Sequence, residues 1–383
     1  MVLEITAFLA LAIWSYLAFG RGGFWRCIER DDGHPPPPAV WPCIAVVIPA
    51  RDEAENIARC LNSLLSQDYP GPWSVVLVDD NSNDSTADIA RRVATDRGAQ
   101  NRTTIVSGAP LPCGWTGKLW ALSQGMAIAQ ARQPVEYLLL SDADIVYAPE
   151  MLRWLVACAV SRDALLASFM VKLRCDSKSE RFLVPAFIFF FQMLYPFSWV
   201  NRHDRATAAA AGGCMLARAD SLREVGGIEA IRDALIDDCA LARKLKARGP
   251  IWLGLTHRAA SIRSYPRWGD IAQMVSRSAY AQLGYSPAQL VGAVLALVLT
   301  FVVPPVAALA GSGYARLFGL GAWVTMTLLF LPTLRIYGVS PLCGAALPAI
   351  ASAYLMFTLD SAFQSMRGKG GFWKGRFQAM RAK

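Results

Sequence analysis

The chain has 383 residues, of which 54% are hydrophobic and 17% charged, and its formal net charge is +9. This composition is too apolar for an ordinary soluble protein and indicates that part of the chain lies in a membrane. A basic excess can attract nucleic acid, anionic lipid or a phosphate-bearing substrate. No helix-turn-helix, zinc-finger or aromatic-basic RNA motif is present, so nucleic acid is not expected as a partner. The nine cysteines form no Cys-x-x-Cys pair and the three histidines have no ligand spacing, which argues against a disulfide framework and against zinc catalysis.

The first segment, residues 2–20, is an apolar run with a single charged residue. At 1.5 Å per residue a helix of this length crosses a bilayer core of about 30 Å. Arg21, Arg26 and Arg30 follow directly, and the positive-inside rule then keeps the next domain in the cytoplasm. We therefore predict a transmembrane anchor over residues 1–22, with a buried core helix as the alternative.

Residues 23–42 are predicted to be a linker. Four consecutive prolines at 35–38 favour an extended polyproline II conformation, which stiffens the exit from the anchor.

From Cys43 onward, short apolar runs alternate with amphipathic stretches. Continuous apolar strands separated by helices specify a mostly parallel α/β sheet, and we place this domain at residues 43–285. In such sheets ligands bind beyond the carboxyl ends of the strands. The predicted strands are 44–49, 73–80, 103–108 and 135–144, and the predicted helices are 53–65, 84–95 and 119–130.

Three acidic pairs follow along the domain, namely Asp79-Asp80, Asp142-x-Asp144 and Asp237-Asp238. Carboxylates at strand ends can hold a divalent cation, bind a nucleotide and deprotonate a hydroxyl, which are the functions that transfer from a nucleotide sugar requires. Singly each pair is a weak signal, because a D-x-D sequence is usually a solvated turn and two acids can merely complement a helix dipole. Their order and their placement at one sheet edge carry the prediction.

Each acid has a position that suits one part of this chemistry. Asp80 ends the second strand and suits the nucleoside, while Asp142 and Asp144 can face the ribose and a metal ion. Lys118 begins a helix after a glycine, where a cation reaches a phosphate, although it could be an ordinary surface lysine. Asp238 opens a helix from which it could face the acceptor.

The segment 183–200 is dense in aromatic residues and interrupted by two prolines. It could be a core helix or a helix lying in the membrane interface, and we favour the interface.

The part of the chain from 286 to 365 returns to membrane composition, with candidate spans at about 288–310, 316–334 and 342–363. Three crossings would place the basic tail, 366–383, on the side opposite to the domain, against the positive-inside tendency. We therefore favour a cytoplasmic tail and expect one of the three segments to be re-entrant or interfacial.

The motifs also resemble a known family. VVIPARDEAENIARCLNSLLSQDYP, VVLVDDNSNDSTADIA and LLLSDADIVYAPEML are similar to the opening and the D-x-D segment of the family-2 inverting glycosyltransferases with the GT-A fold. GGCMLARADSLREVGG and IDDCALARKLKARG resemble their acceptor-side segment and catalytic-base helix, so the likeness covers about residues 43–270. AFGRGGFWR, LPCGWTGKLWAL and FFFQMLYPFSWVN resemble more closely the hopanoid-biosynthesis-associated membrane glycosyltransferases of bacteria.

The resemblance implies a role for each matching position. Asp238 would be the catalytic base for in-line, inverting attack, and Asp144 would hold Mg²⁺ or Mn²⁺. The acceptor-side residues would be Gly212, Gly213, Asp237, Arg267 and Trp268. The nucleotide-binding residues would be Pro49, Arg51, Glu53, Asp80, Lys118 and Asp142.

Two departures from the family pattern bear on the type of transfer. Membrane-bound relatives often carry a Gln/Arg-x-x-Arg-Trp motif; here Arg267-Trp268 are kept and the first polar residue is missing. Asp237 stands where Glu is commoner. A single transfer is therefore favoured over processive polymer synthesis.

The sequence thus predicts a multi-pass enzyme of the bacterial inner membrane with a cytoplasmic GT-A domain. It would move one sugar from a nucleotide donor, with a UDP-sugar favoured, to a lipid acceptor in hopanoid or other lipid biosynthesis. A polyprenyl-phosphate or ceramide-type glycosyltransferase is the enzymatic alternative. A degenerate, non-catalytic transferase domain that binds lipid or organises a complex is the alternative from another class.

Overall fold

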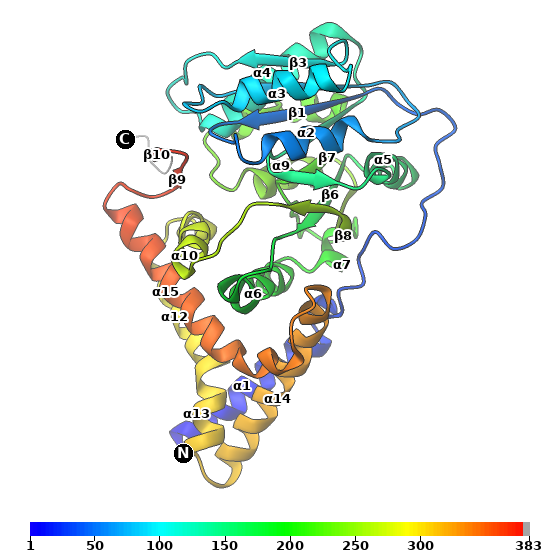
Figure 1. Ribbon diagram of the computed structural model, residues 1–383. Helices are drawn as coiled ribbons and strands as arrows, with labels where there is room; N and C mark the ends of the chain where they lie inside the picture. The colour runs from blue at the N-terminus through cyan, green and yellow to red at the C-terminus, as the bar shows by residue number, and fades with distance from the viewer. Residues whose placement is uncertain (378–383) are drawn as a thin grey trace.

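The computed structural model describes residues 1–377, which form an α/β domain and a tapered group of helices below it (Figure 1). The helical group joins the N-terminal helix to the C-terminal third of the chain, because α1 (Val2–Phe19) packs against α13 and α14. Arg381 and Lys383, which belong to the predicted basic tail, lie outside the described residues.

The domain is built on an eight-stranded sheet in the order β3-β2-β1-β4-β7-β6-β8-β5. Strands β3, β2, β1 and β4 are parallel, as the apolar runs predict. The other half is mixed, since β7 is antiparallel to both of its neighbours, β8 is parallel to β6, and β5 is antiparallel to β8. The strands are β1 Ile44–Ala50, β2 Trp73–Asp79, β3 Thr103–Ser107, β4 Tyr137–Ser141, β5 Ile145–Tyr147, β6 Leu166–Lys172, β7 Cys214–Arg218 and β8 Ile251–Ser261.

Helices cover both faces of the sheet, which explains why every residue of β1 is buried. Alternate strand residues belong to two separate cores: Val47 and Val78 pack on the face of α4, whereas Val46 and Leu77 pack on the opposite face. The helices of the domain are α2 Ile57–Leu65, α3 Thr86–Asp96, α4 Gly117–Arg132, α5 Met151–Ser161, α8 Ala219–Glu224, α9 Asp237–Lys246, α10 Trp268–Ser276 and α11 Ala279–Gln282, with a 3₁₀ turn η2 at Ile228–Ile231.

The aromatic segment forms α6 (Lys178–Leu194) and the short α7 (Phe197–Val200), and it lies between the domain and the helical group (Figure 1). Ser177 and Glu180 close the N-terminus of α6 by reciprocal hydrogen bonds to the backbone. Leu183 and Phe189 are fully buried, and the Phe189 ring lies 5.1 Å from that of Phe330. The helix thus has many core contacts, and its predicted position at a membrane interface stays a prediction.

The helical group has the lengths expected of membrane spans. The Trp14 indole of α1 donates a hydrogen bond of 2.8 Å to the Thr300 carbonyl oxygen, which ties the first helix to the C-terminal third. Among the described residues, 1–377, five segments are long and apolar enough to cross a bilayer: Val2–Phe19, Lys178–Val200, Pro287–Ala310, Gly313–Ile336 and Pro341–Met366. The elements after the domain are α12 Pro287–Leu297, the π-helical η3 Val298–Val302, α13 Val303–Ala310, α14 Gly313–Ile336, η4 Pro341–Ala346 and α15 Leu347–Met366.

The end of α15 brings the chain back to the α/β domain (Figure 1). The helix packs along α10, α11 and α12, and a hairpin of β9 (Phe372–Trp373) and β10 (Arg376–Phe377) follows it. This hairpin contacts the carboxyl ends of β1 and β2, so the described part of the tail lies on the same side of the helical group as the domain.

Candidate active site

The carboxyl ends of β1, β2 and β4 carry the first group of predicted residues. Pro49 is buried within β1, Arg51 follows that strand, and Asp80 follows β2. Arg51 Nη1 donates to the carbonyl oxygens of Asp80, at 2.5 Å, and of Asn81, at 3.1 Å. The guanidinium therefore holds the β2 turn against the end of β1.

Lys118 links two of the acidic pairs. The helix α4 begins one residue before it, and Thr116 caps the N-terminus by accepting a hydrogen bond from Leu119 N. Lys118 Nζ lies 2.9 Å from Asp142 Oδ1 and 3.1 Å from Asp237 Oδ2. These two acids raise the pKa of Lys118 against the effect of burial, so the ammonium stays charged.

Asp238 faces the same group from the first turn of α9. Its Oδ2 accepts a hydrogen bond of 2.9 Å from Gly212 N, and its Oδ1 accepts one of 2.7 Å from Cys239 N. A Cβ atom at Gly212 would lie 3.3 Å from Lys118 Nζ and 3.4 Å from Asp238 Oδ2, so the glycine leaves room between the two charges. Burial and the Asp237 carboxylate raise the pKa of Asp238 to about 6, although Lys118 and two backbone N–H groups act in the opposite direction.

Gly213 fixes the loop that carries Asp142. Its carbonyl oxygen accepts hydrogen bonds from Tyr147 Oη at 3.2 Å and from Asp142 N at 3.4 Å. Burial and the neighbouring Asp144 carboxylate raise the pKa of Asp142, while Lys118 lowers it.

Asp144 is held by one hydroxyl and one guanidinium group. Its Oδ2 accepts hydrogen bonds from Ser261 Oγ at 2.8 Å and from Arg263 Nε at 3.1 Å. The same guanidinium pairs with Glu53 Oε1 through Nη2. Arg263 thus joins the end of β8 to the segment after β1 and to the D-x-D loop.

The C-terminal hairpin covers Asp80 and Glu53. Arg376 Nη1 lies 2.6 Å from Asp80 Oδ2, and the carboxylate is 2% exposed. Lys374 Nζ pairs with Glu53 Oε1 at 3.0 Å and donates to the Asp52 carbonyl oxygen at 2.8 Å, while Arg51 Nε donates to the Lys374 carbonyl oxygen at 3.1 Å. Burial raises the pKa of Asp80 even though Arg376 and Arg51 lower it.

The structure therefore brings the distant acids into one group of interacting charged side chains, from Asp80 through Asp144 and Asp142 to Asp238, and we refer to this group as the cleft. Of the predicted acceptor-side residues, Gly212, Gly213 and Asp237 belong to this cleft. Arg267 and Trp268 have other contacts. Arg267 is exposed and pairs with Asp270 at 3.1 Å, and Trp268 packs on the Phe182 and Phe357 rings.

Known proteins resemble this chain in sequence or in fold. Residues 45–226 match the sequence model described as Glycosyl transferase family 2. Just under half of the chain is therefore similar to this family. The fold of the chain is also that of the mannosyltransferase PcManGT from Pyrobaculum calidifontis, solved in complex with GDP-Man and Mn²⁺, with a TM-score of 0.55 at 17% identity over 95% of this chain and 99% of that one.

Two further proteins match part of this chain at the level of sequence. Glycosyltransferase AglE of Haloferax volcanii is 47% identical over 55 residues, and an N-acetylglucosaminyltransferase of Mesorhizobium japonicum is 31% identical over 158 residues. The matches cover 14% and 41% of this chain, and 18% and 34% of those proteins. The chain therefore matches only a minor part of the length of either relative.

The glycosyltransferase domain offers carboxylate oxygens to a divalent cation. Among residues 1–377 no group of three His, Cys, Asp or Glu side chains is placed to hold an ion by itself. Mg²⁺ in nucleotide sites needs only one or two protein carboxylates, because phosphates and water complete its shell. Asp144 and Asp142 fit such a partial site, because burial and the neighbouring Asp144 carboxylate both raise the pKa of Asp142 and a bound cation would offset this effect.

Sequence reasoning missed three basic residues of the cleft, namely Arg263, Lys374 and Arg376. Arg263 lies two residues beyond the end of β8, so its place near a strand end was a usable signal. The two tail residues gave no such signal, because Arg376 is 296 residues from its partner Asp80.

Proposed function

We propose that this protein is a membrane-bound, inverting glycosyltransferase that moves one sugar from a nucleotide donor to a lipid hydroxyl. The observation that carries the proposal is the position of Asp238. Its carboxylate has a raised pKa and lies across Gly212 from Lys118, whose ammonium also binds the D-x-D residue Asp142. A base and a donor-binding group thus share one cleft.

Each residue of the cleft has a task in this reaction. Asp80 and Asp142 bind the nucleoside, with Arg51 and Glu53 shaping the pocket, and Lys118 binds the diphosphate. Asp238 takes the proton of the acceptor hydroxyl as the oxygen attacks the anomeric carbon from the face opposite to the leaving nucleoside diphosphate. A divalent cation, Mg²⁺ or Mn²⁺, held by Asp144 with Asp142, supplies charge neutralisation to the leaving group.

A hydroxyl acceptor is favoured over a phosphate acceptor by the same carboxylate. A lipid phosphate is already ionised near neutral pH and needs no base to attack. A hydroxyl is hardly acidic and gains from a carboxylate that is ionised just below neutral pH, as Asp238 is. The raised pKa of Asp238 therefore favours a hopanoid or ceramide-type alcohol over a polyprenyl phosphate. Among the alcohols we favour a hopanoid, because three segments resemble the hopanoid-associated enzymes: AFGRGGFWR, LPCGWTGKLWAL and FFFQMLYPFSWVN.

The helical group anchors the enzyme in the bacterial inner membrane with its catalytic domain in the cytoplasm. Arg21, Arg26 and Arg30 follow the first span on that side. The contact of Arg376 with Asp80 keeps the start of the tail beside the domain. We infer that Pro341–Met366, which packs along helices of the domain, is the C-terminal segment that does not cross.

Transfer itself is the decisive test. Membranes that contain the protein are incubated with a panel of labelled sugar nucleotides, UDP-sugars first, and the lipid extract is analysed for a labelled product. The Asp238→Asn variant should bind nucleotide normally and lose transfer by several orders of magnitude, since an amide cannot accept the proton. Asp233→Asn, at an exposed position in the preceding loop, is the matched control and should retain full activity.

Two results would overturn the proposal. Full transfer by Asp238→Asn would remove the assignment of the base. Absence of nucleotide binding by the wild-type protein, with Mn²⁺ present, would favour the non-catalytic alternative, a lipid-binding or scaffold protein with a degenerate transferase domain.

A further inference from the structure

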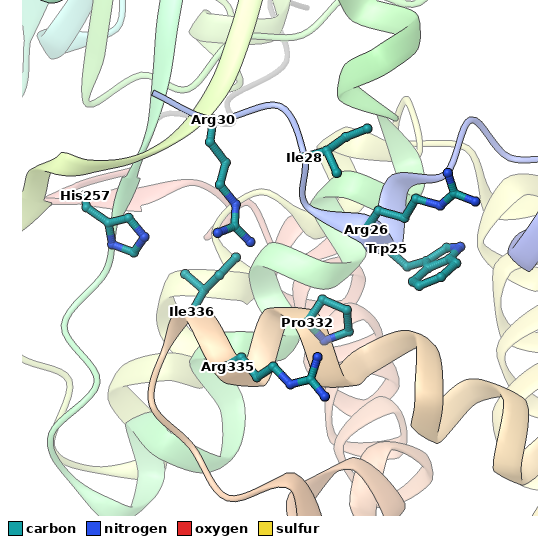
Figure 2. A pocket seen from close by; sticks show the side chains of 8 residues that line it. All are labelled: Trp25, Arg26, Ile28, Arg30, His257, Pro332, Arg335 and Ile336. Carbon is teal, nitrogen blue, oxygen red and sulfur yellow. The ribbon is translucent and has the colours of Figure 1, made fainter. Parts of the chain in front are cut away.

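A second polar site lies outside the glycosyltransferase cleft, where the helical group meets the α/β domain. It is a pocket of about 620 Å³ (Figure 2). Its walls come from three segments that are distant in the sequence: the turn after α1 (the 3₁₀ turn η1, Phe24–Arg26, and the residues that follow), the middle of β8, and the last turn of α14. None of its lining residues belongs to the cleft described above.

The polar lining of this pocket is entirely basic. It consists of the guanidinium groups of Arg26, Arg30 and Arg335 and the imidazole of His257 (Figure 2). Within residues 1–377 none of the three guanidinium groups has a carboxylate within ion-pair distance. The nearby Asp31 carboxylate is taken up by Arg258 at 3.1 Å and by the Thr256 hydroxyl. Three unpaired guanidinium groups around one pocket indicate an anionic ligand.

The rest of the lining is apolar and belongs to the ends of two candidate membrane spans. Trp25 is held to α1, because its indole N–H donates a hydrogen bond of 2.9 Å to the Ala18 carbonyl oxygen. Pro332 and Ile336 belong to the last turns of α14, and Ile28 is 65% exposed. A ligand in this pocket therefore meets positive charge and apolar surface together, at the level where the first and fourth candidate spans end.

We propose that this pocket binds the phosphate headgroup of an anionic membrane lipid, whose acyl chains lie along α14. Arg30 and Arg335 hold the phosphate oxygens, because guanidinium groups bind phosphate with paired N–H donors. Trp25 and Ile336 contact the first carbons of the chains. The site rests on the membrane location in the proposed function, and it does not depend on the identity of the sugar or the acceptor.

The test measures lipid binding by the purified full-length protein in neutral detergent. A fluorescent phosphatidylglycerol is the probe, and a phosphatidylcholine with the same chains and label is the neutral comparison. Each basic residue near a membrane surface contributes about 1 kcal/mol to binding an anionic lipid, so Arg335→Gln should weaken binding of the phosphatidylglycerol about fivefold. The Arg30→Gln/Arg335→Gln pair should weaken it by about another fivefold.

Arg316→Gln is the matched control, because Arg316 is an exposed arginine at the opposite end of the same helix. It should leave the affinity unchanged, and thermal unfolding of all variants checks that they fold. Equal weakening by Arg316→Gln and Arg335→Gln, or equal binding of the neutral lipid, would overturn the proposal. Displacement of the lipid by inorganic phosphate at similar concentrations would show a site for free phosphate and would overturn the lipid assignment.

Nucleotide binding, measured on the same variants, separates this inference from the proposed function. If the wild-type protein binds nucleotide and transfers sugar but does not prefer the anionic lipid, the lipid site alone is refuted. Absence of transfer by wild-type protein that still shows the arginine-dependent lipid binding refutes the proposed function alone.

Discussion

The acid limb of the pH–rate profile should report the titration of Asp238. The carboxylate must be ionised to accept a proton, and its pKa is raised to about 6 from the usual value of 3.8. We therefore expect kcat/KM to be level above about pH 7 and to fall about tenfold for each pH unit well below the pKa. At about pH 5 only about one tenth of the carboxylates are ionised, so activity should be about a tenth of the plateau.

Two substitutions should move this limb in opposite directions. Asp237→Asn removes the carboxylate that raises the pKa of Asp238, so the midpoint should shift to lower pH. Lys118→Gln removes the ammonium that lowers it, so the midpoint should shift to higher pH. Opposite shifts from neighbouring substitutions cannot come from a general loss of stability.

The assay is transfer of labelled sugar to lipid, with rates measured at limiting acceptor concentration so that kcat/KM reports the free enzyme. The reasoning would be refuted by an acid limb that lies near pH 4, or by a midpoint that neither substitution moves. In either case the proton acceptor would have to be another group.

Three further predictions follow from other contacts of the chain. Arg376→Gln should tighten nucleotide binding about two- to tenfold in calorimetric titrations, since the ion pair with Asp80 favours the state in which the hairpin covers this carboxylate. Weaker binding would show instead that the arginine contacts the donor. Chelation of divalent cations should weaken nucleotide binding by wild type but have little effect on Asp144→Ala, and an equal effect on both would remove Asp144 as the ligand. In chemical denaturation, Gly125→Ala should lower the free energy of unfolding by about 1–3 kcal/mol, because its Cβ would lie 2.4 Å from a Val47 methyl group. The control Gly269→Ala, with open space around its Cβ, should change the free energy of unfolding by less than about 1 kcal/mol.

Local patterns in the sequence predict the first half of the domain well. The strands at 44–49, 73–80 and 103–108 coincide with β1, β2 and β3 to within one residue at each end, because each is a short apolar run between helices. The mixed half of the sheet could not be read in this way. The pairing of β4 with β7 joins residues that are about 75 positions apart, and no periodicity encodes which neighbour a buried strand takes or in which direction.

The site shows the same division between local and distant information. Asp80, Asp142 and Asp238 are recognisable because each stands at the end of a strand or the start of a helix. Two of the cations that neutralise the acids are harder to find. Arg263 pairs with Asp144 and Arg376 pairs with Asp80, and each arginine comes from a segment that only the folded chain brings near. Sequence patterns place the reacting carboxylates, whereas the charges that tune them come from the tertiary structure.

The charge distribution of the cleft explains why those distant cations are needed. Asp80, Asp142, Asp144 and Asp238 lie around one space, and without counter-charges they would repel a nucleoside diphosphate. Lys118 and Arg263 are held by acids on both sides, whereas the tail contributes its cations from outside the sheet. In the proposed function, release of Arg376 from Asp80 would free this carboxylate for the nucleoside, while Lys118 and Arg263 would stay in place to meet the phosphates. We therefore propose that Lys118 and Arg263 bind the diphosphate, and that Arg376 on the hairpin controls the access of the nucleoside to Asp80.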